Sequence, residues 1–460
     1  MKSKAQSGPE RRKALKRLAA LAAAVPLASC GGGGSDAMSP TAPPPASPPP
    51  TSQQPAPPPP DSPPPAGQTR PWVTAYYAGY FFDQAGMQMP EHVDMRTMTH
   101  FVFARSAPGG GTLGGKPGDL VYGAGTAGES FNPYSPGWIA QGDPANRSVE
   151  DYLLDKARAQ GTKTLLMVGG EGDGDGWRIS TTTNERPRFI RNLLDYLEVH
   201  RYDGVDIDWE DGLDDAANQA QLIALLKELR TASLQRARYV TAPLIITFPG
   251  YALNTNIETV DPWKVEVAKL VDQYNLMSYA MGYDADGWDT TFFCPVEGAT
   301  GSRPMDLKSS VQAYVDKGVP RSKIGIGIGF YGMNYGPPTD GPRKPIPAGV
   351  RVQSNDTEWA YGNLVRRGYL SHGTETWDPV ARQHWRTYGA GGYQPAGPEA
   401  ASTAGYLSYE DPASIRAKGE WVIANGIGGT IIWLINYGSP DGRSNPLLDA
   451  AKAGFRVRGG

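Results

Sequence analysis

The chain has 460 residues, of which 39% are hydrophobic, and its formal net charge is -3 at pH 7. The basic residues beyond position 17 are scattered among acidic ones, which argues against a nucleic-acid partner. The two cysteines, Cys30 and Cys294, are too few for disulfides to hold a domain of this size together. An apolar core must therefore stabilise the fold.

Residues 1–30 are predicted to be a lipoprotein signal peptide. A basic segment ending at Arg17 precedes an apolar run at 18–27, which is too short to span a bilayer as a helix. The sequence Leu-Ala-Ser-Cys at 27–30 resembles the lipobox of bacterial lipoproteins, in which Cys30 would carry the lipid. The alternative is a free cysteine beside an ordinary cleavage site. Arg11 and Arg12 also resemble a twin-arginine signal, so the export route stays open.

Residues 31–71 are a glycine run followed by a proline-rich tract. Such a segment buries no apolar surface and acts as an extended spacer. We therefore expect an exported lipoprotein of the cell envelope, at the outer membrane or cell surface or released from it, that touches a membrane only through its lipid. From residue 72 onward the composition is mixed and rich in aromatic residues, which predicts one folded unit over residues 72–460.

Short β-branched or aromatic runs alternate with segments of helical periodicity in this unit. The eight runs lie at 73–80, 99–104, 163–168, 204–210, 243–248, 274–279, 323–330 and 429–435. Segments such as 190–197 and 222–229 carry apolar residues at helical spacing, and Ser148 and Asp411 stand where helix caps are expected. The pattern predicts an α/β fold, a closed (β/α)8 TIM barrel whose active site lies at the carboxyl ends of the strands. A doubly wound open sheet is the alternative, but no glycine-rich phosphate turn follows the first run.

Two connections, at 105–160 and 331–404, are too long for a turn and a helix. Insertions of this size on a barrel usually shape the substrate cleft. The second is rich in Tyr, Trp and Gly, and we expect a small α+β subdomain at about 332–404, between the seventh and eighth strands.

The run at 204–210 carries Asp206, Asp208 and Glu210 at every second position, with apolar residues between them. In a strand these three carboxylates share one face, with successive ones roughly 7 Å apart. Inside a barrel that face is the interior, where each ionised carboxylate loses hydration and repels the next, so at least one should hold a proton near neutral pH. Glu210, the last of them, would then open onto the cleft as a proton donor.

Two other interpretations of this run exist. Asp-x-Asp-x-acid spacing occurs in calcium loops, but those require a turn glycine next, whereas this stretch is interleaved with large apolar side chains and is expected to continue as a strand. A solvated edge strand of an antiparallel sheet would show the same alternation, although the pattern of eight runs argues against it.

The motif D-G-x-D-x-D-x-E, filled here by Asp203, Gly204, Asp206, Asp208 and Glu210, resembles glycoside hydrolase family 18, the chitinases. The resemblance extends from about residue 72 to the end of the chain. It includes the first, third, sixth, seventh and eighth strands, at Tyr76-Tyr77, Gly169-Gly170, Met277-Ser278-Tyr279, Phe330-Tyr331-Gly332 and the segment 428–433 that ends in Trp433.

The resemblance implies a retaining reaction on β-1,4-linked N-acetylglucosamine polymers, such as chitin and its oligosaccharides, in which the substrate's own acetamido group attacks the anomeric carbon. Glu210 would protonate the glycosidic oxygen, Asp208 would orient the acetamide N–H, and Asp206 would share a proton with Asp208. Tyr279 would hydrogen-bond the acetamido oxygen, and Trp433 would form the floor under the sugar.

Further substrate contacts are expected from Tyr76, Gly170, Met277, Tyr331 and Trp288, whereas Asp203, at the base of the strand, is expected to be structural. Trp377 and Tyr437 are candidates for further sugar-stacking platforms. For each of these tyrosines and tryptophans, ordinary packing is the alternative. Neither a cofactor nor a metal is implied, and we expect a monomer.

The chain departs from the family pattern at two positions. Met167 stands where the family usually has Ser, and Ala280 stands where it usually has Asp or Asn. Both groups normally help to set the charge around the acids and the acetamide. A related endo-β-N-acetylglucosaminidase acting on N-glycans or peptidoglycan, and a carbohydrate-binding barrel with little activity, therefore stay open as alternatives.

Overall fold

A computed structural model of the protein describes residues 70–82, 84–123, 147–253, 255, 258–284, 288–299, 305–396 and 403–457. The predicted signal peptide with Cys30, and all but the last two residues of the predicted linker, lie outside the described residues. In the described part of the chain, no helix combines the length and the apolar character needed to cross a bilayer.

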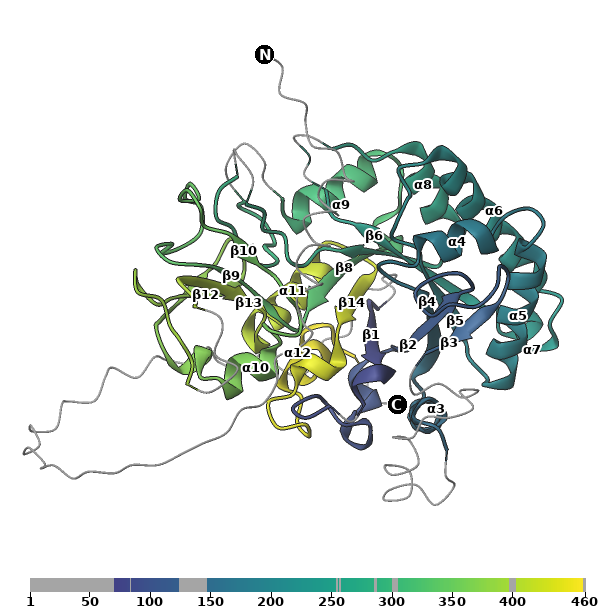
Figure 1. Ribbon diagram of the computed structural model, residues 1–460, viewed down its shortest axis with the longest axis horizontal. Helices are drawn as coiled ribbons and strands as arrows, with labels where there is room; N and C mark the ends of the chain where they lie inside the picture. The colour runs from purple at the N-terminus through teal and green to yellow at the C-terminus, as the bar shows by residue number, and fades with distance from the viewer. Residues whose placement is uncertain are drawn as a thin grey trace, which may run out of the picture.

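Parallel strands close into a barrel, which Figure 1 shows with the helices outside it. The barrel strands are β1 (Trp72–Ala78), β2 (His100–Pro108), β4 (Lys163–Gly169), β5 (Gly204–Asp208), β6 (Ile245–Tyr251), β7 (Gln273–Met277), β8 (Ile324–Gly329) and β14 (Gly429–Trp433). Each pairs with the next one along the chain, and β1 pairs with both β14 and β2, which closes the ring. A short strand, β3 (Leu120–Tyr122), lies antiparallel to β2. All eight predicted runs are barrel strands, and the TIM-barrel prediction is confirmed.

The fifth barrel strand, β6, runs three residues beyond the predicted end at Phe248. The extension includes Pro249, although proline cannot donate to a strand ladder. The pairing of β6 with β5 ends at Thr247, however, whereas its pairing with β7 continues to Tyr251. The missing N–H therefore falls where the pairing with β5 has already stopped, and the strand carries Tyr251 to the mouth of the barrel.

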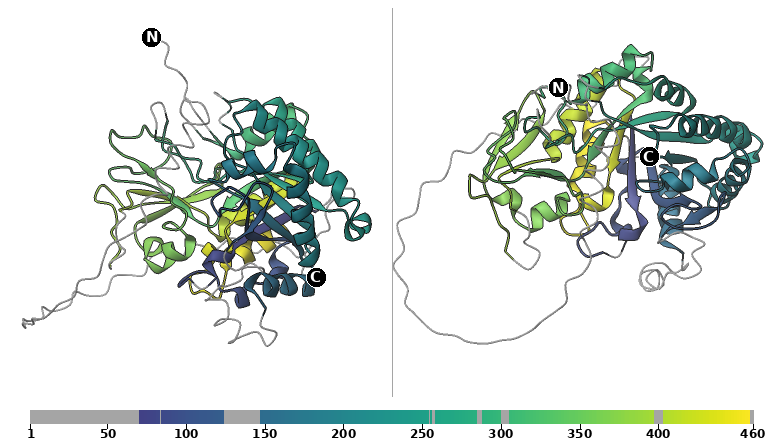
Figure 2. Two further views of the ribbon diagram at one scale, coloured as in Figure 1. Left: turned by 45° about the vertical axis from the view of Figure 1, so that its right-hand side comes forward. Right: turned by 45° about the horizontal axis from the view of Figure 1, so that its top comes forward.

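An outer ring of helices covers the barrel, as both views in Figure 2 show. It consists of α3 (Val149–Ala159), α4 (Gly174–Ser180), α5 (Arg186–Val199), α6 (Ala216–Ser233), α7 (Ala237–Thr241), α8 (Pro262–Leu270), α9 (Leu307–Asp316), α11 (Pro412–Ala424) and α12 (Pro446–Gly454). The predicted caps are present, since Ser148 accepts from the backbone N–H of Asp151 and Asp411 accepts from that of Ser414. These side chains satisfy N–H groups that a helix start leaves without partners.

The first connection differs from the regular repeat. Between β1 and β2 the described residues form three 3-10 helices, η1 (Gly79–Phe81), η2 (Pro90–His92) and η3 (Met95–Thr97), where a covering α-helix was expected. The C-terminal helix α12 packs against η3 and covers this side of the barrel. Two further 3-10 helices, η4 (Arg321–Lys323) and η6 (Ile435–Gly438), flank β8 and β14.

The predicted α+β insertion between the seventh and eighth barrel strands is present and forms the green lobe beside the barrel in Figure 2. Its antiparallel sheet has the order β10-β9-β13-β12-β11. The elements are β9 (Gly332–Tyr335), β10 (Val352–Gln353), α10 (Tyr361–Arg366), η5 (Tyr369–Ser371), β11 (Thr374–Asp378), β12 (Gln383–Thr387) and β13 (Tyr406–Tyr409). Because β13 belongs to this sheet, the insertion extends beyond the predicted end at residue 404.

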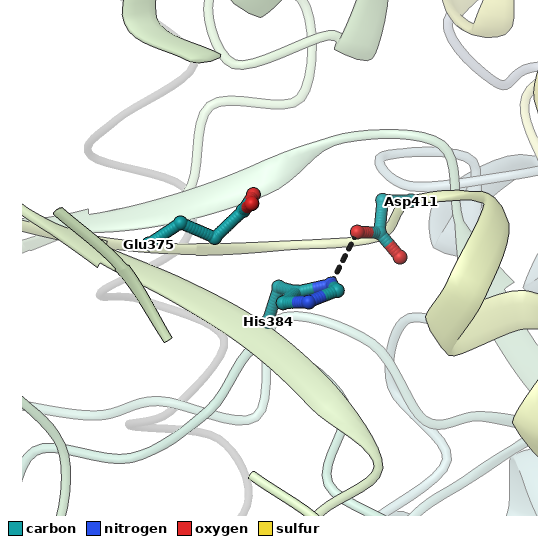
Figure 3. A group of neighbouring side chains, drawn as sticks. All are labelled: Glu375, His384 and Asp411. Carbon is teal, nitrogen blue, oxygen red and sulfur yellow. Dashed lines mark hydrogen bonds and ion pairs between the residues drawn. The ribbon is translucent and has the colours of Figure 1, made fainter. Parts of the chain in front are cut away.

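A cluster of Glu375, His384 and Asp411 joins the insertion to the start of α11 (Figure 3). Their ligand atoms lie within 4.8 Å of one another, a spacing that would suit a metal ion. Both carboxylates already have protein donors, however: Asp411 bonds His384 and caps the helix, and Glu375 accepts from Tyr409 and Arg386. Burial opposes the charge on His384, but the bond to Asp411 outweighs it and raises the pKa of the imidazole. We interpret the cluster as a hydrogen-bond network that connects the insertion to α11.

Candidate active site

The inner face of β5 carries Asp206 into the centre of the barrel. Tyr76 donates a hydrogen bond to Asp206 Oδ2 at 2.9 Å, and the Thr247 hydroxyl donates to Oδ1. Because β1, which carries Tyr76, is not a sheet neighbour of β5, the first bond crosses the barrel interior. The strand lies between β4 and β6, so neither a calcium loop nor a solvated edge strand describes it.

Exposure of the acids increases along the strand toward its carboxyl end. Asp206 is fully buried and Asp208 is 5% exposed, whereas Glu210, just beyond the strand, is half-buried. The Tyr251 hydroxyl lies 3.2 Å from the backbone oxygen of Glu210 and 3.5 Å from its Oε2. Trp209 points the opposite way and is fully buried among the core residues. The row of acids therefore ends at the mouth of the barrel.

The electrostatic environment favours a shared proton on the inner pair of acids. Burial raises the pKa of Asp206, although the hydrogen bonds from Thr247 and Tyr76 oppose this. Burial, Glu210 and Asp206 raise the pKa of Asp208. Asp208 Oδ1 is buried and has no hydrogen-bond partner among the residues that the structure describes, so it can accept from a donor on a ligand.

Hydroxyl and aromatic groups surround the acids. Burial, followed by the charges of Glu210 and Asp208, raises the pKa of the Tyr279 hydroxyl, which therefore stays a donor at neutral pH. The ring of Trp433 lies 5.8 Å from that of Tyr76, and the ring of Tyr279 lies 5.9 Å from that of Tyr331. The structure thus brings together the predicted acids and four of the predicted aromatic contacts, which lie on or just after β1, β7, β8 and β14, namely Tyr76, Tyr279, Tyr331 and Trp433.

Gly170, at the end of β4, is also part of this group. Its backbone N–H donates to the backbone oxygen of Asp208 at 2.8 Å, and its φ of 123° is one that favours glycine. Met277 ends β7 and is half-buried. These two predicted contacts therefore lie at strand ends on the same side of the barrel.

The other predicted platforms are less closely associated with the acids. Trp288 is buried against Tyr283, with ring centroids 5.2 Å apart, and Tyr437 is buried beside Phe81 and Tyr331. Trp377 is exposed on β11, the edge strand of the insertion. Trp288 and Tyr437 are buried, and Trp377 lies on a different sheet from the acids.

The two departures from the family pattern lie on either side of the acids. Met167 on β4 is in register with Asp206 on β5, so a thioether and not a hydroxyl lies beside that carboxylate. Ala280 follows Tyr279 with a φ of 51°, and its side chain offers no hydrogen bond. Asp206 depends instead on Tyr76 and Thr247 for its donors.

Several residues of the site were not predicted from the sequence. Asp356, from the insertion, accepts a 2.9 Å hydrogen bond from Trp433 Nε1 and so fixes the predicted sugar floor. Arg105 on β2 is close enough to oppose the rise in the pKa of Asp208. The one sequence signal for Thr247 is its position as a polar residue within an apolar strand.

Asp203 directly precedes β5, at the end of the strand opposite Glu210. Among the described residues it makes no hydrogen bond to the other acids of the motif. Its Oδ2 accepts from the backbone N–H of Thr164 at 3.0 Å, and its Oδ1 pairs with Lys163 at 3.2 Å. These contacts tie β5 to the start of β4, as expected of a structural residue.

Replacing Asp203 by Ala is expected to lower the free energy of unfolding by about 1–2 kcal/mol, because a backbone donor loses its partner. The turnover rate per folded molecule should stay within about twofold, since the change is at the far end of the strand from Glu210. Urea denaturation and an activity assay on the same preparation measure both. A large loss of turnover in a fully folded variant would contradict the structural role.

Comparison with known proteins agrees with the family resemblance seen in the sequence. The sequence profile of Glycosyl hydrolases family 18 matches residues 73–438. Chitinase 1 of Aphanocladium album is 28% identical over 311 residues, which cover 64% of this chain and 66% of that protein. The match thus spans just under two thirds of that relative's length.

Solved structures share the barrel fold. The Group IV chitinase of Ostrinia furnacalis superposes with a TM-score of 0.62 and 20% identity over 84% of this chain and 100% of that one. A mutant of the Class V chitinase from Nicotiana tobaccum, solved in complex with NAG4, gives 0.61 and 19% over 84% and 99%. With the profile match over most of the chain, this protein belongs to glycosyl hydrolases family 18.

Proposed function

We propose that the protein is a secreted glycoside hydrolase that cleaves β-1,4-linked N-acetylglucosamine polymers, chitin and its oligosaccharides, by a retaining, substrate-assisted mechanism. The observation that carries the proposal is the row of acids on β5, in which two buried carboxylates precede a half-buried Glu210 at the barrel mouth. Relatives named as chitinases and a neighbour solved with NAG4 support this substrate class.

In the proposed reaction Glu210 transfers its proton to the glycosidic oxygen as the bond from that oxygen to the anomeric carbon breaks. The carbonyl oxygen of the substrate's acetamido group forms the new bond to the anomeric carbon, giving an oxazolinium ion. Water then attacks that carbon as its bond to the carbonyl oxygen breaks, which restores the acetamido group, and Glu210 takes the proton from the water. Because the anomeric carbon is attacked twice, its configuration is retained.

The groups around Glu210 fit the charges that this reaction develops. Asp208 Oδ1, which has no hydrogen-bond partner in the described part of the chain, can accept the acetamide N–H. An ionised Asp208 also stabilises the positive charge of the oxazolinium ion, and Asp206 can take up the proton that Asp208 gives up. The Tyr279 hydroxyl, held protonated by its surroundings, can donate to the acetamido oxygen.

Incubation of the purified protein with colloidal chitin tests the proposal. Mass spectrometry should find chitooligosaccharides, and NMR of the first products should find the β-anomer, as retention requires. N-glycans with a chitobiose core and peptidoglycan, assayed in parallel, distinguish the alternative substrates. Tight oligosaccharide binding without release of any sugar would overturn the hydrolase proposal and favour a binding protein.

The proposal includes export as a lipoprotein through Cys30. Labelling of producing cells with a fatty acid should mark the wild-type protein and not the Cys30→Ala variant, which should leave the membrane fraction. Equal labelling of both proteins would contradict lipidation at this cysteine.

A further inference from the structure

Arg105 is a charged residue in the second half of β2, and its charge acts on Asp208 although β4 lies between β2 and β5 in the sheet. The register between β2 and β4 shifts between Phe103 and Ser106, so Arg105 lies in a bulge. A bulge leaves its extra residue unpaired and redirects its side chain. Only 17% of the Arg105 side chain is exposed, although arginine is rarely buried without a specific partner.

The guanidinium group has three protein partners. Arg105 Nη1 donates to the backbone oxygen of Gly169 at 2.7 Å and also contacts Asp173 Oδ2, while Nη2 donates to the Thr112 hydroxyl at 2.6 Å. The Asp173 side chain is completely buried, and its other oxygen accepts from the backbone N–H and the hydroxyl of Thr112 at 2.6 and 2.7 Å. These contacts hold the guanidinium in one orientation.

The turn that Arg105 supports packs directly on Asp208. A β-carbon added to Gly169 would approach the backbone oxygen of Asp208 to 2.3 Å. A β-carbon on Gly170 would lie 3.5 Å from Arg105 Nη1 and 3.8 Å from Asp208 Oδ2. The guanidinium and this carboxylate oxygen therefore line the same small space beside Gly170, together with the Met167 methyl group at 3.3 Å from the same point.

We propose that Arg105 is a positioning residue of this active site, which fixes the Gly169-Gly170 turn against Asp208 and supplies the positive charge that stabilises ionised Asp208. The inference rests on the proposed function and deepens it. Met167 offers no hydrogen-bond donor to the acids. The positive charge of Arg105 therefore provides part of the stabilisation that a buried, ionised carboxylate requires.

Most other charges near Asp208 act against its ionisation. Burial, Glu210 and Asp206 raise its pKa, as does Asp173, and Arg105 lowers it. The titratable groups that face Asp208 are Asp206 and Glu210 on its own strand, Asp173 after β4, Arg105 on β2, Tyr76 and Tyr80 at β1, and Tyr279 after β7. Arg105 is thus the cation among them, and Asp173 partly cancels its charge.

The experiment compares two single variants that have opposite expected effects. Arg105→Met removes the cation and should raise the pH of the acid limb of kcat/KM by about one unit, because Asp208 holds its proton to higher pH. Asp173→Asn removes the opposing charge and leaves the cation, so the acid limb should move to lower pH. Arg105→Lys should restore most of the wild-type profile.

A merely structural role would not produce opposite shifts. If Arg105→Met leaves the acid limb unmoved, or if both single variants move it in the same direction, the proposal is overturned. Should Arg105→Met fail to fold, the double variant Arg105→Met with Asp173→Asn removes both members of the buried ion pair. The acid limb of its kcat/KM profile should still lie at higher pH than that of the single variant Asp173→Asn. If the acid limb lies at the same pH in those two variants, the proposal is also overturned.

A second measurement separates this proposal from the proposed function. In protein with ¹³C-labelled aspartate, the carboxyl signal of Asp208, assigned through Asp208→Asn, can be titrated whether or not sugar is released. Its midpoint should rise in Arg105→Met and fall in Asp173→Asn. These shifts without chitin cleavage would reject the hydrolase proposal and leave the charge compensation standing, whereas cleavage without the shifts would reject the role of Arg105.

Discussion

Replacing Glu210 by Gln is expected to lower kcat on chitooligosaccharides by about 10³-fold, because the amide has the shape of the acid but no proton to transfer to the leaving oxygen. The side chain is half-buried at the end of its strand, so the fold should tolerate the change. Initial rates on a soluble oligosaccharide measure the loss. An aryl glycoside, whose leaving group needs little protonation, should show a much smaller loss in its first, bond-breaking step.

The control for this variant is Glu266→Gln on α8. Glu266 pairs with Lys227 at 3.0 Å on the outside of the barrel, so its replacement should change kcat by less than about twofold, since exposed ion pairs contribute little. Oligosaccharide affinity should be retained in Glu210→Gln. An undiminished rate in that variant would remove Glu210 from the role of acid, and with it the proposed mechanism.

The barrel and its inward-facing acids could be predicted from the sequence because both depend on local periodicity. Alternation with a period of two places Asp206, Asp208 and Glu210 on one face whatever the rest of the chain does. The closed parallel topology then makes that face the interior. The hydrogen bond from Tyr76 to Asp206 across the barrel confirms this orientation.

The contacts that depend on irregular segments could not be predicted in this way. Asp356 reaches Trp433 from the insertion, across 77 positions of the chain, and no periodic pattern relates the two. Arg105 follows the predicted end of its strand at residue 104, and the bulge that redirects its side chain has no signature in the sequence. The missing helix after β1 is likewise replaced by α12 from the far end of the chain.

Asp208→Asn is expected to lower kcat by about 10²–10³-fold and, at neutral pH, to raise the melting temperature. The amide cannot stabilise the oxazolinium charge, and such electrostatic contributions are large in a water-poor site. The stability effect has the opposite sign because Asp208 is a buried acid whose pKa in the folded protein lies above its unfolded value.

For an acid with a raised pKa, ionisation destabilises the folded state once the pH exceeds the unfolded value. Below the unfolded pKa, near 4, both states hold the proton and the term vanishes. The gain in melting temperature should therefore be present at pH 7 and absent near pH 3.5. Calorimetry at the two pH values, beside an activity assay at pH 7, measures both effects. A variant that is less stable than the wild type at pH 7 would show that ionised Asp208 is already well compensated, which contradicts the raised pKa of its carboxyl group.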